Sequence, residues 1–420
     1  MKHNFFRKIS PILTAVTGLA VLALLIGACS SDRPTPEATP SQAKMALNST
    51  QVNPVILANT RFGFKLFAQI YEQQKNKNIF ISPKSISAAL SMTYNGAKGE
   101  TQEAIGNTLE LSGISLEEIN QGNVNLKKSL ETADKKVTLN IANSLWLNDT
   151  TSFLPDFIQR VAESYGAELT QLDFSDSDSA STINNWVKEK TNNKIESIID
   201  RIEPNQMLFL INAVYFKGLW KTPFTKDATK EAAFTLLDGS TKQHPLMTNA
   251  GDYAYYETDT FQAISLPYGE GRWSFYVFLP KPTVTLATFY ETMTAENWEQ
   301  WMNQFRVVPG SITLPRFQLE YEIGLNETLQ TLGMEMAFDP QQADFSGISP
   351  QPANISQVKH KTFIEVNEEG TEAAAATSIG IVATSVPPPP FKMVVDRPFF
   401  CTIRDNQTGT ILFMGSIVDP

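Results

Sequence analysis

The sequence predicts an α+β fold built on a large, mostly antiparallel β-sheet. Helical periodicity dominates the first part of the chain, strand patterns follow, and the strands are widely separated along the sequence. The 420 residues are 42% hydrophobic and 19% charged, so the chain can bury a large core and is not a disordered polymer. Its two cysteines exclude a disulfide-stapled scaffold.

Two helices are predicted near the start of the folded region. Five residues recur at helical spacing in the first of them: Val55, Asn59, Phe62, Leu66 and Ile70. The second is predicted to begin with Ser82 as its cap and Pro83 in its first turn. Its apolar face then continues through Ile86, Leu90 and Tyr94.

Strand patterns follow these helices. Side chains alternate with period two over residues 137–147, and the apolar run at 207–216 is typical of a strand buried on both faces. Residues 261–266 and 273–279 flank a Gly-Glu-Gly turn and predict a hairpin. Further strands are predicted at residues 311–321, 355–368, 391–404 and 410–418.

The first 28 residues look like a bacterial lipoprotein signal peptide. Three basic residues precede an apolar run at 12–26, and the small residues Gly27 and Ala28 lead into Cys29, whose thiol would carry the lipid. A membrane-spanning helix is the alternative, but the run is shorter than the roughly 20 residues that a span needs. Cleavage before Cys29 would change the formal net charge from −10 to −13.

Residues 29–52 are rich in Ser, Thr and Pro and predict a flexible tether after the lipidated cysteine. Residues 53–420 contain no second linker and no repeat, so we expect a single folded domain. The expected location is extracytoplasmic, with a lipid anchor in a bacterial membrane, either in the periplasm or at the cell surface. A solute-binding lipoprotein is disfavoured because the chain lacks repeated βαβ units.

The sequence offers little for catalysis. It has no G-x-S-x-G, H-E-x-x-H, phosphate-loop, dinucleotide-binding or C-x-x-C motif, and only three histidines. We expect His244 at the surface, His360 as a hydrogen-bonded core histidine, and Cys401 as a small buried hydrophobe. We therefore expect no enzyme, no cofactor and no metal site, and the acidic balance argues against nucleic-acid partners.

The segment from residue 365 to residue 391 is unusual because it reads as a strand that continues into small residues. One face carries no charge, and it consists of Thr371, Ala373, Ala375, Thr377, Ile379, Ile381 and Ala383. The segment ends in four prolines, which cannot donate to a β-ladder. It is predicted either to be exposed and later become a strand, or to be a flexible surface loop.

Four separated motifs resemble the serpin family across residues 53–420. They are NIFISPKSISAAL with NGAKGET at residues 78–101, NAVYFKGLW at 212–220, EEGTEAAAAT at 368–377, and DRPF with FMG between residues 396 and 415. The resemblance implies helices around three β-sheets and an exposed reactive loop.

The resemblance also implies a mechanism. An inhibitory serpin is a suicide substrate: the protease nucleophile cleaves the reactive loop and forms an acyl-enzyme. The cut loop then inserts into the main sheet, and the attached protease is distorted before it can hydrolyse the ester. The implied partner is a serine protease, with cysteine proteases as a second class. A non-inhibitory serpin that carries a ligand or binds a partner is the alternative.

The hinge of this loop decides whether the acyl-enzyme is trapped or hydrolysed, because slow insertion would make the protein a substrate. The hinge residues implied by the resemblance are Glu368, Gly370, Thr371, Ala373, Ala375 and Thr377. The small residues among them follow the inhibitory pattern, since a charged or bulky side chain would stall insertion.

The resemblance places the reactive bond fourteen residues after the hinge glycine, at Thr384-Ser385. Counting back from the DRPF motif gives a position near Pro387 instead, and the neighbouring bonds at Ala383 and Val386 remain alternatives. No Lys or Arg occurs from residue 371 to residue 391, which favours an elastase- or subtilisin-like target over a trypsin-like one.

Further roles are implied for residues in the sheet body. A polar cluster beneath the point where the sheet opens would contain Ser82, Ser85, Asn212 and His360, with Trp220 near the end where insertion begins. Arg316 and Glu368 are expected to pair across that opening. The stretch 115–136 holds four lysines against four acids, so we expect no glycosaminoglycan partner, and we expect a monomer.

Overall fold

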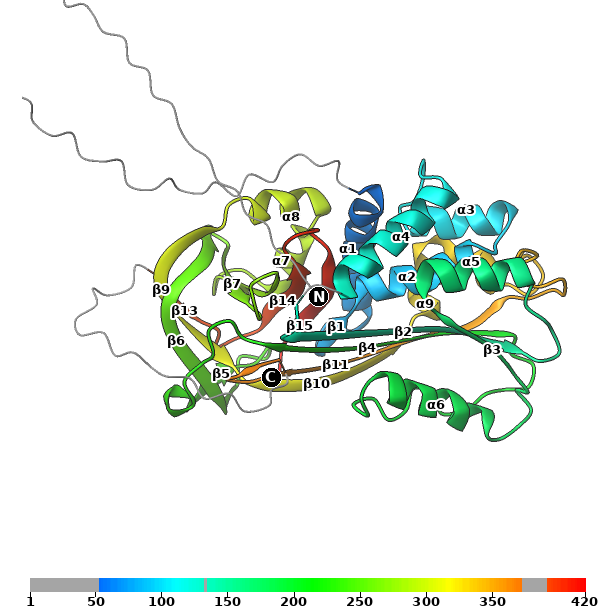
Figure 1. Cartoon of the computed structure of the whole chain (residues 1–420). Coiled ribbons are helices and arrows are strands. Elements are labelled where there is room, and N and C mark those ends of the chain that lie inside the picture. Colours follow the sequence, from blue (N-terminus) through cyan, green and yellow to red (C-terminus); the bar gives the residue numbers. More distant parts are fainter. Residues whose placement is uncertain (1–52, 132–133, 372–390) are drawn as a thin grey trace, which may run out of the picture. The chain divides into compact units, whose positions relative to one another are not determined.

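The computed structural model describes residues 53–131, 134–371 and 391–420 (Figure 1). The predicted signal peptide, Cys29 and the tether lie outside the described residues. So do Ala373, Ala375, Thr377 and the predicted reactive bond Thr384-Ser385.

The described helices lie mainly in the first half of the chain. They are α1 (Pro54–Gln73), α2 (Pro83–Tyr94), α3 (Gly99–Thr108), α4 (Leu116–Glu131), α5 (Pro155–Tyr165), α6 (Ser179–Lys190), α7 (Leu286–Glu291), α8 (Ala295–Met302), α9 (Asn326–Leu329) and α10 (Glu335–Phe338). No helix of the described ranges is long and apolar enough to cross a bilayer.

The main sheet has six strands in the order β10-β11-β12-β4-β2-β3, and β4 also pairs directly with β11. These strands are β2 (Val137–Asn148), β3 (Glu168–Leu172), β4 (Leu208–Leu219), β10 (Phe317–Gly324), β11 (Ile355–Val366) and β12 (Gly370–Thr371). α2 packs on one face of this sheet, and α6 covers the opposite face (Figure 1).

The second sheet has nine strands, and its main path runs β1-β15-β14-β8-β7-β6-β9-β13. The strands are β1 (Ile79–Ile81), β5 (Lys230–Thr235), β6 (Thr241–Glu257), β7 (Phe261–Pro267), β8 (Trp273–Pro280), β9 (Arg306–Pro315), β13 (Phe391–Val394), β14 (Phe399–Asp405) and β15 (Ile411–Ile417). The long strand β6 pairs with β5 at one end and β7 at the other, which joins two of the three implied sheets into one hydrogen-bonded sheet.

The predicted elements are confirmed with two corrections. The expected strand at 311–321 is two strands, because the chain leaves β9 at Pro315 and enters β10 of the other sheet at Phe317. The expected strand at 391–404 is also two strands, β13 and β14, with Pro398 between them. Pro315 ends β9 and Pro398 directly precedes β14, and neither proline can donate to a β-ladder at these strand ends.

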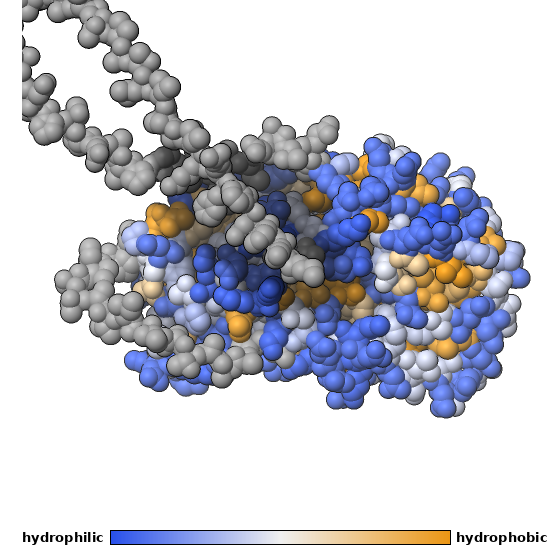
Figure 2. All heavy atoms as spheres, in the orientation of Figure 1, coloured by the Kyte–Doolittle hydropathy of each residue, from blue (hydrophilic) through white to orange (hydrophobic). Residues whose placement is uncertain are grey.

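Most of the core lies between the helices and the two sheets, and a second apolar cluster lies between α6 and the main sheet. Trp146, Phe209 and Phe363 of the sheet meet Ile183 and Val187 of α6 in this second cluster. Figure 2 shows a mostly hydrophilic face, with apolar side chains reaching the surface chiefly near α3 and α5.

Lys84 of α2 is an unusual member of the core, since only 6% of its surface is exposed. Its Nζ atom donates to Asn123 Oδ1 of α4 at 3.2 Å, and burial lowers the pKa of Lys84 to about 8. The unfolded chain therefore binds more protons between about pH 8 and 10.5, so stability rises with pH across that window. At neutral pH the buried ammonium costs about 3 kcal/mol.

We expect Lys84→Met to raise the free energy of unfolding at pH 7 by about 2 kcal/mol, because the lost hydrogen bond to Asn123 offsets about 1 kcal/mol of the gain. Urea unfolding measured from pH 7 to pH 10 checks this, and the variant should also lose the rise of stability with pH. Lys77→Met, at an exposed position, is the control and should change little. A destabilised Lys84→Met protein at pH 7 would contradict the prediction.

Candidate functional site

The candidate site is the place where β4 and β11 separate. The two strands pair directly over residues 208–215 and 355–363. Beyond this stretch β12 lies between them: Thr371 pairs with Gly218 of β4 and with Val366 of β11, and Gly370 pairs with Leu219. The start of the predicted hinge is thus already a strand of the main sheet, with the Thr371 side chain fully buried.

Gly370 is required by the closeness of this pairing. A Cβ atom at position 370 would lie 2.1 Å from the carbonyl oxygen of Gly218, which is backbone and cannot move aside. A Cβ atom at Gly218 would in turn meet the ring of Tyr268 at 2.9 Å. Two glycines therefore let the hinge strand enter against β4.

A buried polar cluster lies further along the same two strands. His360 of β11 accepts a hydrogen bond from the backbone N–H of Ser82 at 3.0 Å, and its Nδ1–H donates to Asn212 Oδ1 of β4. Asn212 Nδ2 donates to Ser85 Oγ of α2 at 2.6 Å and to Asn143 Oδ1 of β2. The structure thus brings four predicted residues together, although Ser82 takes part through its backbone.

Asn143 is a member of this cluster that the sequence analysis did not single out. It lies on β2 in register with Asn212 and is 7% exposed. Its signal was present in the sequence, because it is the one polar residue among the apolar positions that alternate along residues 137–147. A buried amide in such a pattern requires polar partners.

The His360 side chain links β11 to β4. It is completely buried, and burial lowers its pKa to about 3, so the imidazole is neutral at physiological pH. The prediction of a hydrogen-bonded core histidine is confirmed. Its bond to Asn212 spans β11 and β4, so separating those strands must break it.

Trp220 lies apart from this cluster, at the end of the sheet where β12 enters. Its Nε1–H donates to the carbonyl oxygen of Asn367 at 2.8 Å, and its backbone N–H donates to the carbonyl oxygen of Glu369. Its ring stacks on Tyr268 with the centroids 4.5 Å apart. Trp220 thereby holds the turn that connects β11 to β12.

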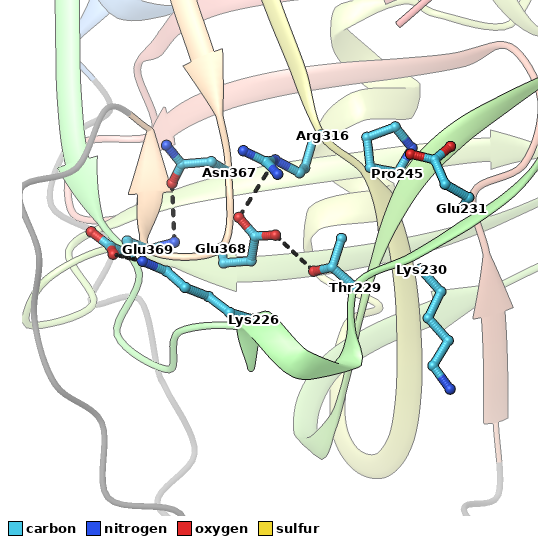
Figure 3. A pocket seen from close by; sticks show the side chains of 9 residues that line it. All are labelled: Lys226, Thr229, Lys230, Glu231, Pro245, Arg316, Asn367, Glu368 and Glu369. Atoms are coloured by element: carbon cyan, nitrogen blue, oxygen red, sulfur yellow. Dashed lines mark hydrogen bonds and ion pairs between the residues drawn. The ribbon is translucent and has the colours of Figure 1, made fainter.

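A cavity of about 610 Å³ opens beside this turn (Figure 3). Glu368 lies in its wall, where its carboxylate accepts a hydrogen bond from Thr229 Oγ1 at 2.7 Å and pairs with Arg316 at 3.5 Å. Glu369 pairs with Lys226 at 2.5 Å. The expected contact between Arg316 and Glu368 is therefore present, and Glu368 and Glu369 each form an ion pair with a basic side chain.

The other end of the predicted loop segment is held in the second sheet. β13 begins at Phe391 and pairs in parallel with β9. The Phe391 ring stacks on Tyr255 with the centroids 4.1 Å apart, and a Cβ atom on Gly310 would lie 1.9 Å from it. Thr371 and Phe391, which flank residues 372–390, are thus each fixed in a strand.

The predicted His and Cys residues lie apart from one another in the described part of the chain. This part of the chain contains no group of three or more His, Cys, Asp or Glu side chains placed to bind a metal ion. Cys401 is fully buried as predicted, and burial raises the pKa of its thiol, which keeps it protonated and unreactive. His244 is partly buried, with its Nε2 hydrogen-bonded to the carbonyl oxygen of Arg316.

Comparison with known proteins matches this architecture to one family. A family model described as Serpin (serine protease inhibitor) matches residues 57–420. The human leukocyte elastase inhibitor is 36% identical over 376 residues, which cover 86% of this chain and 98% of that protein.

Solved structures agree with the sequence comparison. The thermophilic serpin tengpin in its native state has a TM-score of 0.81 and 35% identity, covering 87% of this chain and 94% of its own. Human thyroxine-binding globulin has a TM-score of 0.82 and 29% identity, covering 88% and 99%. The family model matches far more than half of the sequence, and this chain belongs to the serpin family.

Proposed function

We propose that this serpin inhibits serine proteases, with cysteine proteases as a second class, as a suicide substrate. The observation that carries the proposal is the pairing of Gly370 and Thr371 between β4 and β11. A strand that starts in this position can be extended only by separating those two strands. The residues that follow it, from Ala373 to Thr377, are small enough to enter the sheet.

The reactive bond in this proposal is Thr384-Ser385, and the target is elastase- or subtilisin-like. The absence of Lys and Arg from residues 371–391 supports this target class. The name of the human relative, leukocyte elastase inhibitor, points the same way.

The protein acts outside the cytoplasm in this proposal, held on a bacterial membrane by the lipid on Cys29. The basic start, apolar run and small residues before Cys29 support it. We propose a monomer that uses neither nucleic acid nor a glycosaminoglycan. The balanced charge of α4 supports the last point, since its Lys127 pairs with Glu131.

A non-inhibitory carrier is the second candidate, because a structural relative is thyroxine-binding globulin, solved in complex with thyroxine. Carrying an apolar ligand requires a pocket lined mainly by apolar side chains. The cavity beside the hinge is instead lined mostly by charged and polar residues, including Lys226, Arg316, Glu368 and Glu369. This polar lining favours the inhibitor.

The test is incubation of the purified protein with elastase-, subtilisin- and trypsin-like proteases. We expect an elastase- or subtilisin-like enzyme to form a covalent complex that survives denaturing electrophoresis, and a released peptide that begins at Ser385 in mass spectrometry. Cleavage by every protease without a trapped complex would refute inhibition. A trypsin-like enzyme trapped in preference to the others would refute the target class.

A further inference from the structure

Tyr268 is a buried residue that lies beside the hinge strand β12. It follows β7, forms an isolated β-bridge with Trp220, and is fully buried. Its hydroxyl group lies 2.6 Å from Thr371 Oγ1 and forms a hydrogen bond with it. Tyr268 directly follows β7 of the second sheet, whereas Thr371 is the second residue of β12 in the main sheet.

The Tyr268 ring cannot follow Thr371 if the hinge moves away. It stacks on Trp220 at an interplanar angle of 9°, and its edge lies against Phe216 with the centroids 5.1 Å apart. Gly218 packs so closely against it that no Cβ atom would fit between them. The Tyr268 hydroxyl is therefore held in place and can bond Thr371 only while the hinge strand is docked.

This bond is the side-chain contact that holds Thr371 itself, beyond the Trp220 contacts and ion pairs that hold the turn before it. β12 makes one residue pair with β11 and two with β4, so its backbone pairing is minimal. If the strand leaves, the buried Tyr268 hydroxyl loses the hydrogen bond that it makes with Thr371 among the described residues. An unsatisfied buried hydroxyl is costly, so the bond favours the docked hinge by about tenfold or more.

We infer that Tyr268 is a positioning residue for loop insertion, which holds Thr371 docked between β4 and β11 in the uncleaved protein. The inference rests on the proposed inhibitory function. Because Gly370 and Thr371 are already paired in the main sheet, insertion after cleavage extends an existing strand and does not have to start a new one. This shortens the time in which the acyl-enzyme can hydrolyse.

The test uses Tyr268→Phe and Thr371→Val, each of which removes one hydroxyl and keeps the shape of the side chain. Hydrogen exchange at the amide of Thr371, which pairs with both β4 and β11, reports docking without any protease. We expect both variants to exchange about tenfold faster than the unaltered protein, and the double variant to exchange no faster than either. Thr371→Ser, which retains the hydroxyl, should restore slow exchange.

The second readout is the number of inhibitor molecules consumed per protease trapped. We expect it to rise about fivefold or more in Tyr268→Phe, with the rate of cleavage unchanged. Tyr276→Phe is the matched control, because it also removes a hydroxyl that donates a hydrogen bond, to Asn406, but lies in β8. This control should change neither exchange at the Thr371 amide nor trapping.

Each outcome has one meaning. Unchanged exchange in Tyr268→Phe would refute the claim that the Tyr268 hydroxyl holds the hinge docked, and faster exchange with unchanged trapping would refute its role in insertion. If no variant and not even the unaltered protein traps a protease, while Tyr268→Phe still speeds exchange, the proposed inhibition fails and the docking role of Tyr268 is supported.

Discussion

Thr377→Glu is expected to convert the protein from an inhibitor into a substrate. Thr371 pairs with Gly218 and Val366, and the inserted strand would run antiparallel to both neighbours. Six residues further along, Thr377 would therefore lie level with Asn212 and His360, which also pair with each other across β4 and β11. Three independent pairings thus agree on one position for Thr377.

The identity of residue 377 matters because, in the proposed mechanism, insertion would break the bond between His360 and Asn212. An even spacing from Thr371 places Thr377 on the same buried face. Its hydroxyl could accept a hydrogen bond from His360 and donate one to Asn212, replacing the bond that is lost. A glutamate carboxylate would instead enter a buried cluster that contains no cation among the described residues.

We expect this buried charge to slow insertion by about 100-fold or more, since each 1.4 kcal/mol of added barrier is a factor of ten. Hydrolysis of the acyl-enzyme would then win, and under about one tenth of the encounters would end in a trapped complex. Gel densitometry of complex and cleaved protein measures this ratio. Thr377→Ser is the matched control and should trap normally, whereas efficient trapping by Thr377→Glu would contradict the inserted register.

Local patterns predicted the elements that form this site. The apolar run at 207–216 gave β4, and the cap and first turn at Ser82 and Pro83 gave α2. Both patterns depend on neighbours a few residues apart, which a single sequence displays directly. The resemblance then identified Ser85, Asn212 and His360, which the structure brings together through hydrogen bonds.

Other features of the site were not predictable from local patterns. Tyr268 and Thr371 are 103 residues apart, and Tyr268 lies just outside a strand, where no periodicity marks its side chain. The break at Arg316 was missed because β9 and β10 are continuous in sequence and alternate alike, while they belong to different sheets. Long-range pairing determines both, and no local propensity encodes it.

Acid is expected to destabilise the closed sheet through His360. Burial lowers the pKa of His360 from 6.5 to about 3, so the unfolded chain binds a proton there that the folded protein does not. Stability should therefore fall as the pH drops below 6.5, by about 3 kcal/mol at pH 4.5 and by about 4 kcal/mol near pH 3. A proton on Nε2 would also face the backbone N–H of Ser82, so that two donors would meet.

Urea unfolding between pH 7 and pH 4.5 measures this fall, in a range where most carboxylates of ordinary pKa remain ionised. His360→Gln should be less stable at pH 7 and should lose most of the slope, whereas His244→Gln should retain it. Proton NMR gives a check that needs no variant to fold: the ring protons of His360 should not titrate above pH 4. A His360 resonance that shifts near pH 6.5 would show that the imidazole accepts its proton without opening the sheet, and the proposed acid sensitivity of the bond between β4 and β11 would be wrong.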